Sequence, residues 1–145
     1  MAVALAAGVV TAVGCGDDDD SAAGTYRVQA DAVFCTDLIS ARDTVISDVV
    51  DASAGVSPAG VATFAGSYEP ILRDHIEALR ALDPADRADE AAVAGITDAA
   101  TAVADHLRTM ADEPTTAPST PDDLRRLATS PLLAERLRVA GLRSC

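Results

Sequence analysis

Three cysteines and two histidines are the residues of this chain whose side chains could do distinctive chemistry. A thiol can form a disulfide, take a lipid or act as a nucleophile, and an imidazole can bind a metal or carry a proton. The cysteines are Cys15, Cys35 and Cys145. In a secreted chain, an odd number of cysteines is typical of one disulfide plus one thiol with a separate fate. The first residues indicate whether this chain is secreted.

Residues 1–14 are almost wholly apolar and carry no charge. A run of this length is too short for a permanent membrane span but suits the apolar part of an export signal. No positive charge precedes the run, so either translation starts further upstream or the signal is atypical. A buried N-terminal helix is the other interpretation. The Gly-Cys ending and the acidic residues after it favour a removable leader.

The segment Ala12-Val13-Gly14-Cys15 resembles a bacterial lipobox, in which small residues precede a cysteine that is lipidated and becomes the mature N-terminus. Small residues fit this role because a peptidase must hold an extended chain against its active site. The resemblance implies a diacylglyceryl group on Cys15 and cleavage between Gly14 and Cys15. It also implies that the mature protein is anchored in the cell membrane, on the extracytoplasmic face.

An acidic stretch with aspartate at positions 17–20 follows Cys15. Four adjacent carboxylates repel one another and have nothing apolar to bury. A calcium loop would need carboxylates at alternating positions with a turn glycine, and consecutive aspartates do not provide that geometry. We therefore expect residues 15–24 to be a flexible, solvated tether and residues 25–145 to form the folded domain.

Cys35 falls on an expected apolar stripe, and Cys145 is the final residue of the chain. In an oxidising exterior these two thiols are the natural pair for a disulfide. A bond that closes a loop of about 110 residues would stabilise the fold by about 4–5 kcal/mol on chain-entropy grounds. Two free thiols are the alternative. A redox-active pair is not indicated, because the sequence has no Cys-x-x-Cys spacing.

The two histidines, His75 and His106, each directly follow an aspartate in an expected helix. Adjacent helical residues point about 100° apart, so neither pair is a ready-made His-carboxylate dyad. A carboxylate-bridged di-metal bundle needs Glu three residues before each histidine, and those positions hold Leu72 and Val103. A single metal shared by the two histidines and a carboxylate is the alternative to two ordinary boundary histidines.

Charge and motif content exclude several classes of function. The formal net charge is -12 and no basic cluster offsets it, which argues against nucleic acid and against a polybasic lipid-binding patch. The sequence has no Gly-x-Ser-x-Gly, phosphate-binding loop or zinc-protease motif. We therefore predict a protein that is not an enzyme, has no cofactor and has no nucleic-acid partner.

Apolar periodicity predicts the four helical segments that must position these residues. They are expected at about 26–52, 58–82, 84–110 and 121–141. Predicted N-caps are Thr25, Ser57, Asp83 and Thr120, the last three with a following proline, and Gly141 is the expected C-terminal stop. Val28, Ala32, Cys35, Ile39, Ile46 and Val49 define the expected buried stripe of the first segment, and Phe34, Leu38 and Val45 widen it.

The composition and the segment pattern together predict the fold class. Aromatic residues make up 3% of the chain and Trp is absent, so alanine and small aliphatic residues must form a core of close-packed helices. Pro70 and Pro131 fall inside helical patterns; Pro70 predicts a kink, and Ser130-Pro131 predicts a kink or a break. Four antiparallel segments with short loops favour an all-α, up-and-down four-helix bundle with kinked helices.

The whole layout resembles small helical lipoproteins of actinobacterial type. The features that carry the resemblance are the lipobox, the acidic tether, and the early and terminal cysteines, and all eleven basic residues are Arg. The resemblance carries no catalytic residues across. We expect a non-enzymatic binding or structural module of the cell envelope, whose partner is an unknown envelope protein or small ligand. A carrier of a small apolar ligand is the alternative, and a His-based metal-dependent protein is a weaker one.

Overall fold

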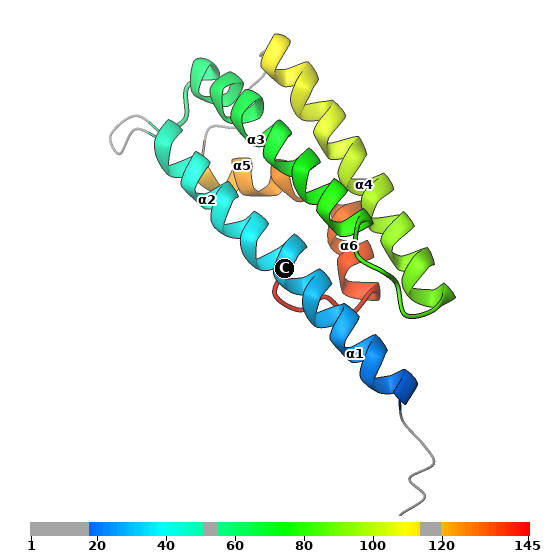
Figure 1. The fold of residues 1–145 in the computed structure, drawn as a ribbon. Coiled ribbons are helices and arrows are strands. Elements are labelled where there is room, and N and C mark those ends of the chain that lie inside the picture. Colours follow the sequence, from blue (N-terminus) through cyan, green and yellow to red (C-terminus); the bar gives the residue numbers. More distant parts are fainter. Residues whose placement is uncertain (1–17, 51–54, 114–119) are drawn as a thin grey trace, which may run out of the picture.

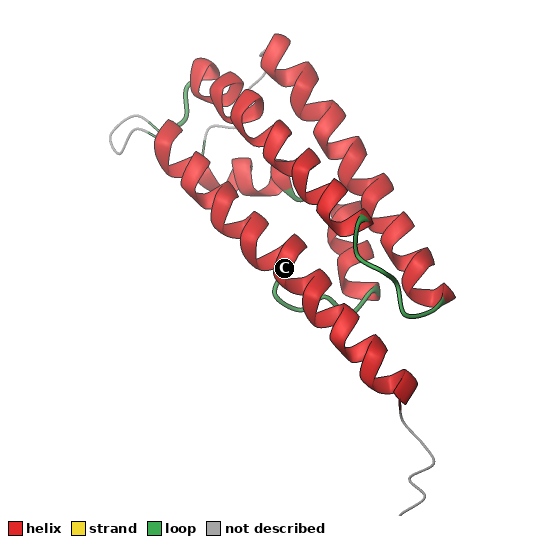
Figure 2. Ribbon diagram, in the orientation of Figure 1, coloured by secondary structure: helices red, strands yellow, loops and turns green. Residues whose placement is uncertain are grey.

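The computed structural model describes residues 18–50, 55–113 and 120–145, and within these ranges it holds helices and loops but no strand (Figure 2). The elements are α1 (Asp18–Ala30), the π-helical segment η1 (Asp31–Thr36), α2 (Asp37–Val49), α3 (Pro58–Arg80), α4 (Arg87–Asp112), α5 (Pro121–Ala128) and α6 (Pro131–Val139). The all-α prediction is confirmed. The leader, Cys15 and the first residues of the tether lie outside the described residues.

Three long elements run alongside one another in alternating directions (Figure 1). The first is a continuous rod made of α1, η1 and α2, the second is α3 and the third is α4. The fourth position holds α5, which contacts α2, and α6, which packs on α4. The expected four-helix up-and-down bundle is therefore not confirmed. Ser130 caps a new helix and Pro131 occupies its first turn, so the fourth segment is broken in two.

The rod begins earlier than the sequence predicted. Helix α1 starts at Asp18, inside the acidic stretch, so residues 18–24 are helical and Thr25 is not an N-cap. The expected tether and the helix therefore overlap over residues 18–24. The first buried side chain described is Tyr26.

The rod also changes its hydrogen-bond pattern at η1, and this shifts the buried face. The predicted positions of Val28 and Ala32 on the stripe are wrong, because Val28 is 70% exposed and Ala32 is also exposed. Steps of four residues drift by about 40° around an α-helix. A π turn holds more residues than an α turn. It therefore reverses that drift and keeps residues four positions apart on one side of the rod. The buried residues at this spacing are Tyr26, Ala30, Phe34 and Leu38.

Most helix boundaries follow their capping residues. The side chains of Ser57, Thr120 and Ser130 accept hydrogen bonds from backbone N–H groups three residues later, at 3.0, 3.2 and 3.2 Å. The predicted N-cap Asp83 is wrong. Asp86 caps α4 instead, because its Oδ1 accepts from the N–H groups of the second and third helical residues at 2.7 and 2.8 Å.

Helix α3 continues through Pro70 and ends at Arg80. Proline lacks the N–H that would bond the carbonyl of Gly66, and its ring crowds that carbonyl. Pro70 is exposed, so the freed carbonyl lies on the side of the helix where water can reach it. A change in axis direction at Pro70 stays a prediction.

The core lies chiefly between α3 and α4. Phe64 and Tyr68 stack on one face of α3, with ring centroids 5.3 Å apart. Helix α4 presents buried alanines at Ala99, Ala100 and Ala104, which allow close approach of the helices. Large aliphatic side chains fill the space on both sides: Val61, Leu72, Ile76, Leu79, Ile96, Val103 and Leu107.

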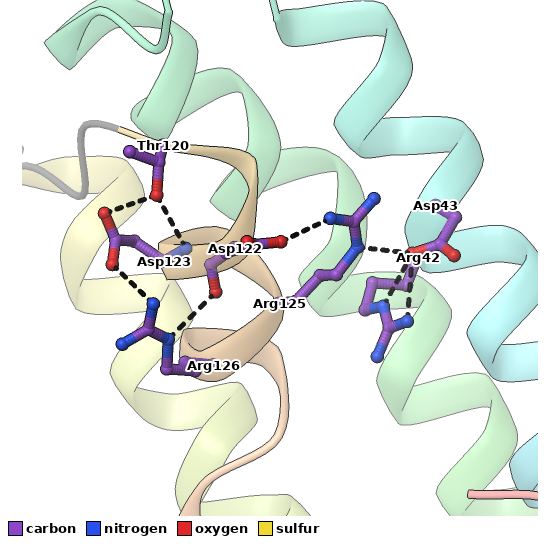
Figure 3. A network of polar contacts seen from close by, with 7 residues as sticks. All are labelled: Arg42, Asp43, Thr120, Asp122, Asp123, Arg125 and Arg126. Atoms are coloured by element: carbon purple, nitrogen blue, oxygen red, sulfur yellow. Dashed lines mark hydrogen bonds and ion pairs between the residues drawn. The ribbon is translucent and has the colours of Figure 1, made fainter.

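Figure 3 shows how polar contacts orient α5 against the rod. Arg125 donates from Nη1 to Oδ1 of Asp122, and its Nε lies 3.4 Å from Oδ1 of Asp43 on α2. At the start of α5, Thr120 donates to the Asp123 carboxylate at 2.7 Å and accepts from the Asp123 N–H. Exposed ion pairs contribute little to stability. The network therefore sets the direction of α5, while apolar burial holds it in place.

The exposure of Val28 on the rod can be tested by comparison with Val61, a buried valine of α3, in two matched substitutions. Val61→Ala removes two buried carbons from a residue with 0% exposure, and should lower the free energy of unfolding by about 2 kcal/mol. Val28→Ala makes the same chemical change at an exposed site and should have almost no effect. Urea denaturation measures both. A large loss for Val28→Ala would show that the sequence-based stripe is the correct one.

Candidate functional site

The predicted disulfide between Cys35 and Cys145 is present. Cys35 lies in η1 with 0% exposure, and Cys145 is the exposed last residue. Their Cα atoms are 4.7 Å apart, within the range of protein disulfides. The bond links residues 110 positions apart. It therefore joins the end of the chain to the middle of the first rod.

A reversal of the chain after α6 brings Cys145 back to that rod. Gly141 has a φ of +75°, which a residue without a side chain adopts freely. Its N–H donates to the carbonyl of Arg138, and the N–H of Leu142 donates to the carbonyl of Leu137, both at 3.1 Å. This is the hydrogen-bond pattern of a Schellman C-cap, and the buried Leu142 completes it. The predicted stop at Gly141 is confirmed.

A second attachment lies beside the disulfide and was not predicted. The backbone N–H of Ser144 donates to Oδ1 of Asp31 at 3.0 Å, and the Ser144 hydroxyl donates to Oδ2. These bonds, the hydroxyl bond above all, hold the pKa of the Asp31 carboxyl below its usual range. Asp31 and Cys35 are four residues apart in η1, so one turn of the rod holds the tail at two points.

The two histidines do not form a site with other ligands in the described part of the chain. Nδ1 of His75 lies 2.8 Å from the carbonyl oxygen of Ile71 on its own helix, a bond that a protonated Nδ1 donates. His106 is exposed. Within residues 18–50, 55–113 and 120–145, no three His, Cys, Asp or Glu side chains are placed to share a metal ion. A shared metal between the histidines therefore gains no support.

Two buried carboxylates were not singled out from the sequence. The first is Glu69 on α3, which accepts a hydrogen bond from Arg73 and lies 3.3 Å from Nη2 of Arg108 on α4. Arg73 also donates to Asp105 of α4 at 2.8 Å. These contacts join α3 to α4 next to Pro70. The second is Asp89 near the start of α4, which has no comparable set of partners.

The cavities differ sharply in size. Two pockets that reach between helices, one beside Phe34 and Tyr68 and one beside Tyr26 and Asp89, have volumes of about 20 and 10 Å³. Each has room for about one water molecule. A groove of about 500 Å³ lies outside the second pocket, between the start of α4 and the end of α6. Space for a small ligand is therefore on the surface.

One further property concerns the membrane. None of the helices in the part of the chain that the structure describes is both long and apolar enough to cross a bilayer. Membrane attachment through Cys15, which lies outside that part, stays a prediction.

The disulfide should contribute much of the stability of the domain. Cys35→Ala with Cys145→Ala should lower the melting temperature by about 5–15 °C, because even 2 kcal/mol of lost stabilisation shifts a domain of this size that far. Reduction of the wild type should produce a similar loss and leave the double variant unchanged. Reaction of both thiols with a labelling reagent in the native, unreduced protein would contradict the bond.

The Asp31 carboxylate should make stability depend on pH. Its pKa is lowered on folding, so its stabilisation is present above its ordinary value of 3.8 and is lost as pH falls through the lowered value. The difference in free energy of unfolding between wild type and Asp31→Asn should shrink between about pH 6 and about pH 2. Ser144→Ala removes the hydroxyl donor and should weaken this dependence. Parallel pH profiles of wild type and Asp31→Asn would exclude the contribution.

Comparison of the chain with family models, with curated proteins and with solved structures found no match. What the protein does must therefore follow from its own residues. The features that bear on function are the C-terminal tail held by the disulfide, the cysteine in the lipobox-like segment, and the groove beside a buried carboxylate.

Proposed function

We propose that this protein is a membrane-anchored extracytoplasmic lipoprotein that serves as a non-enzymatic binding or structural module of the cell envelope. The lipid is carried on Cys15, at the end of the Ala12-Val13-Gly14-Cys15 segment. In this proposal α5 and α6 together take the place of the fourth helix of an up-and-down bundle.

The observation that carries the proposal is the Cys35–Cys145 disulfide. Disulfides persist in oxidising compartments outside the cytoplasm and are rare where thiols are kept reduced. A chain exported by a leader reaches such a compartment. An odd count of three cysteines leaves one outside the disulfide. In this proposal that cysteine is Cys15, and it carries the lipid.

The geometry of the first rod also supports an anchor at this end. Helix α1 projects beyond the other helices (Figure 1). Its first residue, Asp18, follows Cys15 by three positions, and Tyr26 is the first buried side chain among those whose burial the structure describes. Eight helical residues span about 12 Å. A short helical stalk would therefore hold the bundle near the membrane surface and limit its reach.

A binding or structural role fits the polar groups better than catalysis does. The clusters of charged side chains at Glu69 and at Arg125 consist of arginine–carboxylate pairs within and between helices, and the pairs Arg108–Glu69 and Arg125–Asp43 link neighbouring helices. Nucleophile–base pairs of the kind that acyl transfer needs have their side chains within hydrogen-bond reach of each other. The hydrogen bonds of Ser57, Thr120, Ser130 and Ser144 instead go to helix caps and to Asp31.

Lipidation can be tested by metabolic labelling with a fatty-acid analogue. The wild type should be labelled and should stay with the membrane fraction, whereas Cys15→Ser should lose the label. The matched control is Cys35→Ala with Cys145→Ala, which leaves Cys15 as the only cysteine and should keep the label. Equal labelling of wild type and Cys15→Ser would rule out the anchor.

A further inference from the structure

Two polar groups near the start of α4 are buried without hydrogen-bond partners among the described residues. They are the hydroxyl of Tyr26, on α1, and Oδ2 of Asp89, on α4. Tyr26 is 6% exposed and Asp89 is 4% exposed. The nearest cation is Arg27, whose Nε lies 3.5 Å from Oδ1 of Asp89, longer than a good hydrogen bond. The first turn of α4 also offsets part of the Asp89 charge through the helix dipole, but Oδ2 has no donor, and a buried polar atom without a partner needs an explanation.

Tyr26 and Asp89 are both among the residues that line the pocket of about 10 Å³ between α1 and α4. That pocket shares Arg27, Asp89, Ala92 and Ala140 with the open groove of about 500 Å³, so the two hollows adjoin. The volume of the groove lies within the usual range for small-molecule sites.

Small residues and two arginines shape the groove. Its walls include Ala88, Ala92, Gly95 and Ala140, which leave room for a ligand close to the backbone. The side chain of Arg136 from α6 lies over Gly95, where a Cβ would come within 3.4 Å of its Cδ. Arg27 also lines the groove. The open part of the site therefore has positive charges, and its inner end has a negative one.

We propose that this site binds a small zwitterionic amine, with its ammonium group in the inner pocket and its carboxylate toward Arg27 and Arg136. An ammonium group has three donors and is about as large as a water molecule. It can donate to Oδ2 of Asp89 and to the Tyr26 oxygen together, and its charge compensates the buried carboxylate. An anion without an ammonium group would be repelled by Asp89. A cation without a carboxylate would leave the arginines unused.

The inference deepens the binding role under Proposed function and rests on it, but it does not depend on the lipid anchor. The two can fail separately, because labelling at Cys15 and ligand binding at Asp89 are measured independently. Loss of the label with binding retained would overturn only the anchor. Labelling without binding would overturn only the ligand site.

Three compounds with the same four-carbon chain test the two charged groups separately. They are 4-aminobutyrate, which carries both groups, butylamine, which carries only the ammonium, and butyrate, which carries only the carboxylate. In NMR titrations of the oxidised full-length chain, 4-aminobutyrate should shift amide signals of residues 88–95 and 136–141. The two single-charge compounds should bind about tenfold more weakly, the effect of losing one charge-assisted hydrogen bond. No shifts, or equal affinity for butylamine or butyrate, would overturn the proposal.

Substitutions at the inner end locate the site. Asp89→Asn should weaken binding of 4-aminobutyrate about tenfold, and Tyr26→Phe should weaken it less, because a neutral acceptor contributes less than a charged one. Asp98→Asn is the matched control, since it makes the same change at an exposed position of α4, and should bind normally. Unchanged binding by Asp89→Asn would overturn the assignment.

Thermal unfolding distinguishes a ligand site from a structural one. Removal of an uncompensated buried charge should leave the melting temperature of Asp89→Asn unchanged or raise it. Substitution of a structural carboxylate would instead lower the melting temperature. Glu69→Gln should do so, because Arg73 and Arg108 lose Glu69 as a charged partner. A lower melting temperature for Asp89→Asn with normal binding would assign Asp89 to folding and overturn the proposal.

Discussion

The covalent bond between Cys35 and Cys145 is the constraint on which the closed shape of this domain depends. The last three residues after Leu142 have no helix of their own, and a free tail of that length would fray. The disulfide and the two hydrogen bonds from Ser144 to Asp31 hold it against the rod instead. Because α6 also packs on α4, the same attachment connects the first rod to the third long helix. A bond between residues 110 positions apart strongly restricts the conformations of the unfolded chain, and this stabilises the folded state.

Placement of that bond depends on a local irregularity. A regular α-helix through residues 26–38 would rotate its four-residue steps away from the core. The π turn at η1 corrects the rotation and buries Phe34 and Cys35 together. It also aligns Asp31 with Cys35 above the returning tail. One irregular turn therefore serves both the core and the disulfide.

The two buried carboxylates show how differently the same group can be used. Glu69 is compensated by two arginines and joins α3 to α4, as a structural ion pair does. Asp89 lines a pocket, with Arg27 Nε at 3.5 Å from its Oδ1, no donor to its Oδ2, and a Tyr26 hydroxyl that has no hydrogen-bond partner among the described residues. Burial, and secondly the nearby Asp89 charge, raise the pKa of Tyr26 and keep its hydroxyl protonated. A folded protein retains such an arrangement more readily where a ligand completes it than where nothing does.

The sequence by itself determined the helical class, the starts of α3 and α5, the stop at Gly141 and the pairing of Cys35 with Cys145. These features rest on local chemistry, namely capping side chains, proline at the first turn, glycine at positive φ, and the only two thiols available within the domain. Only the tertiary structure decided the π turn, the burial of Tyr26 in place of Val28, the choice of a break over a kink at Pro131, and the burial of Asp89. Each of these depends on which face of a helix meets a neighbour, and apolar spacing cannot fix that face once the number of residues per turn changes. A charged residue near a helix start looks the same in sequence whether it is solvated or buried, so Asp89 could be recognised only when α1 and α6 were in place around it.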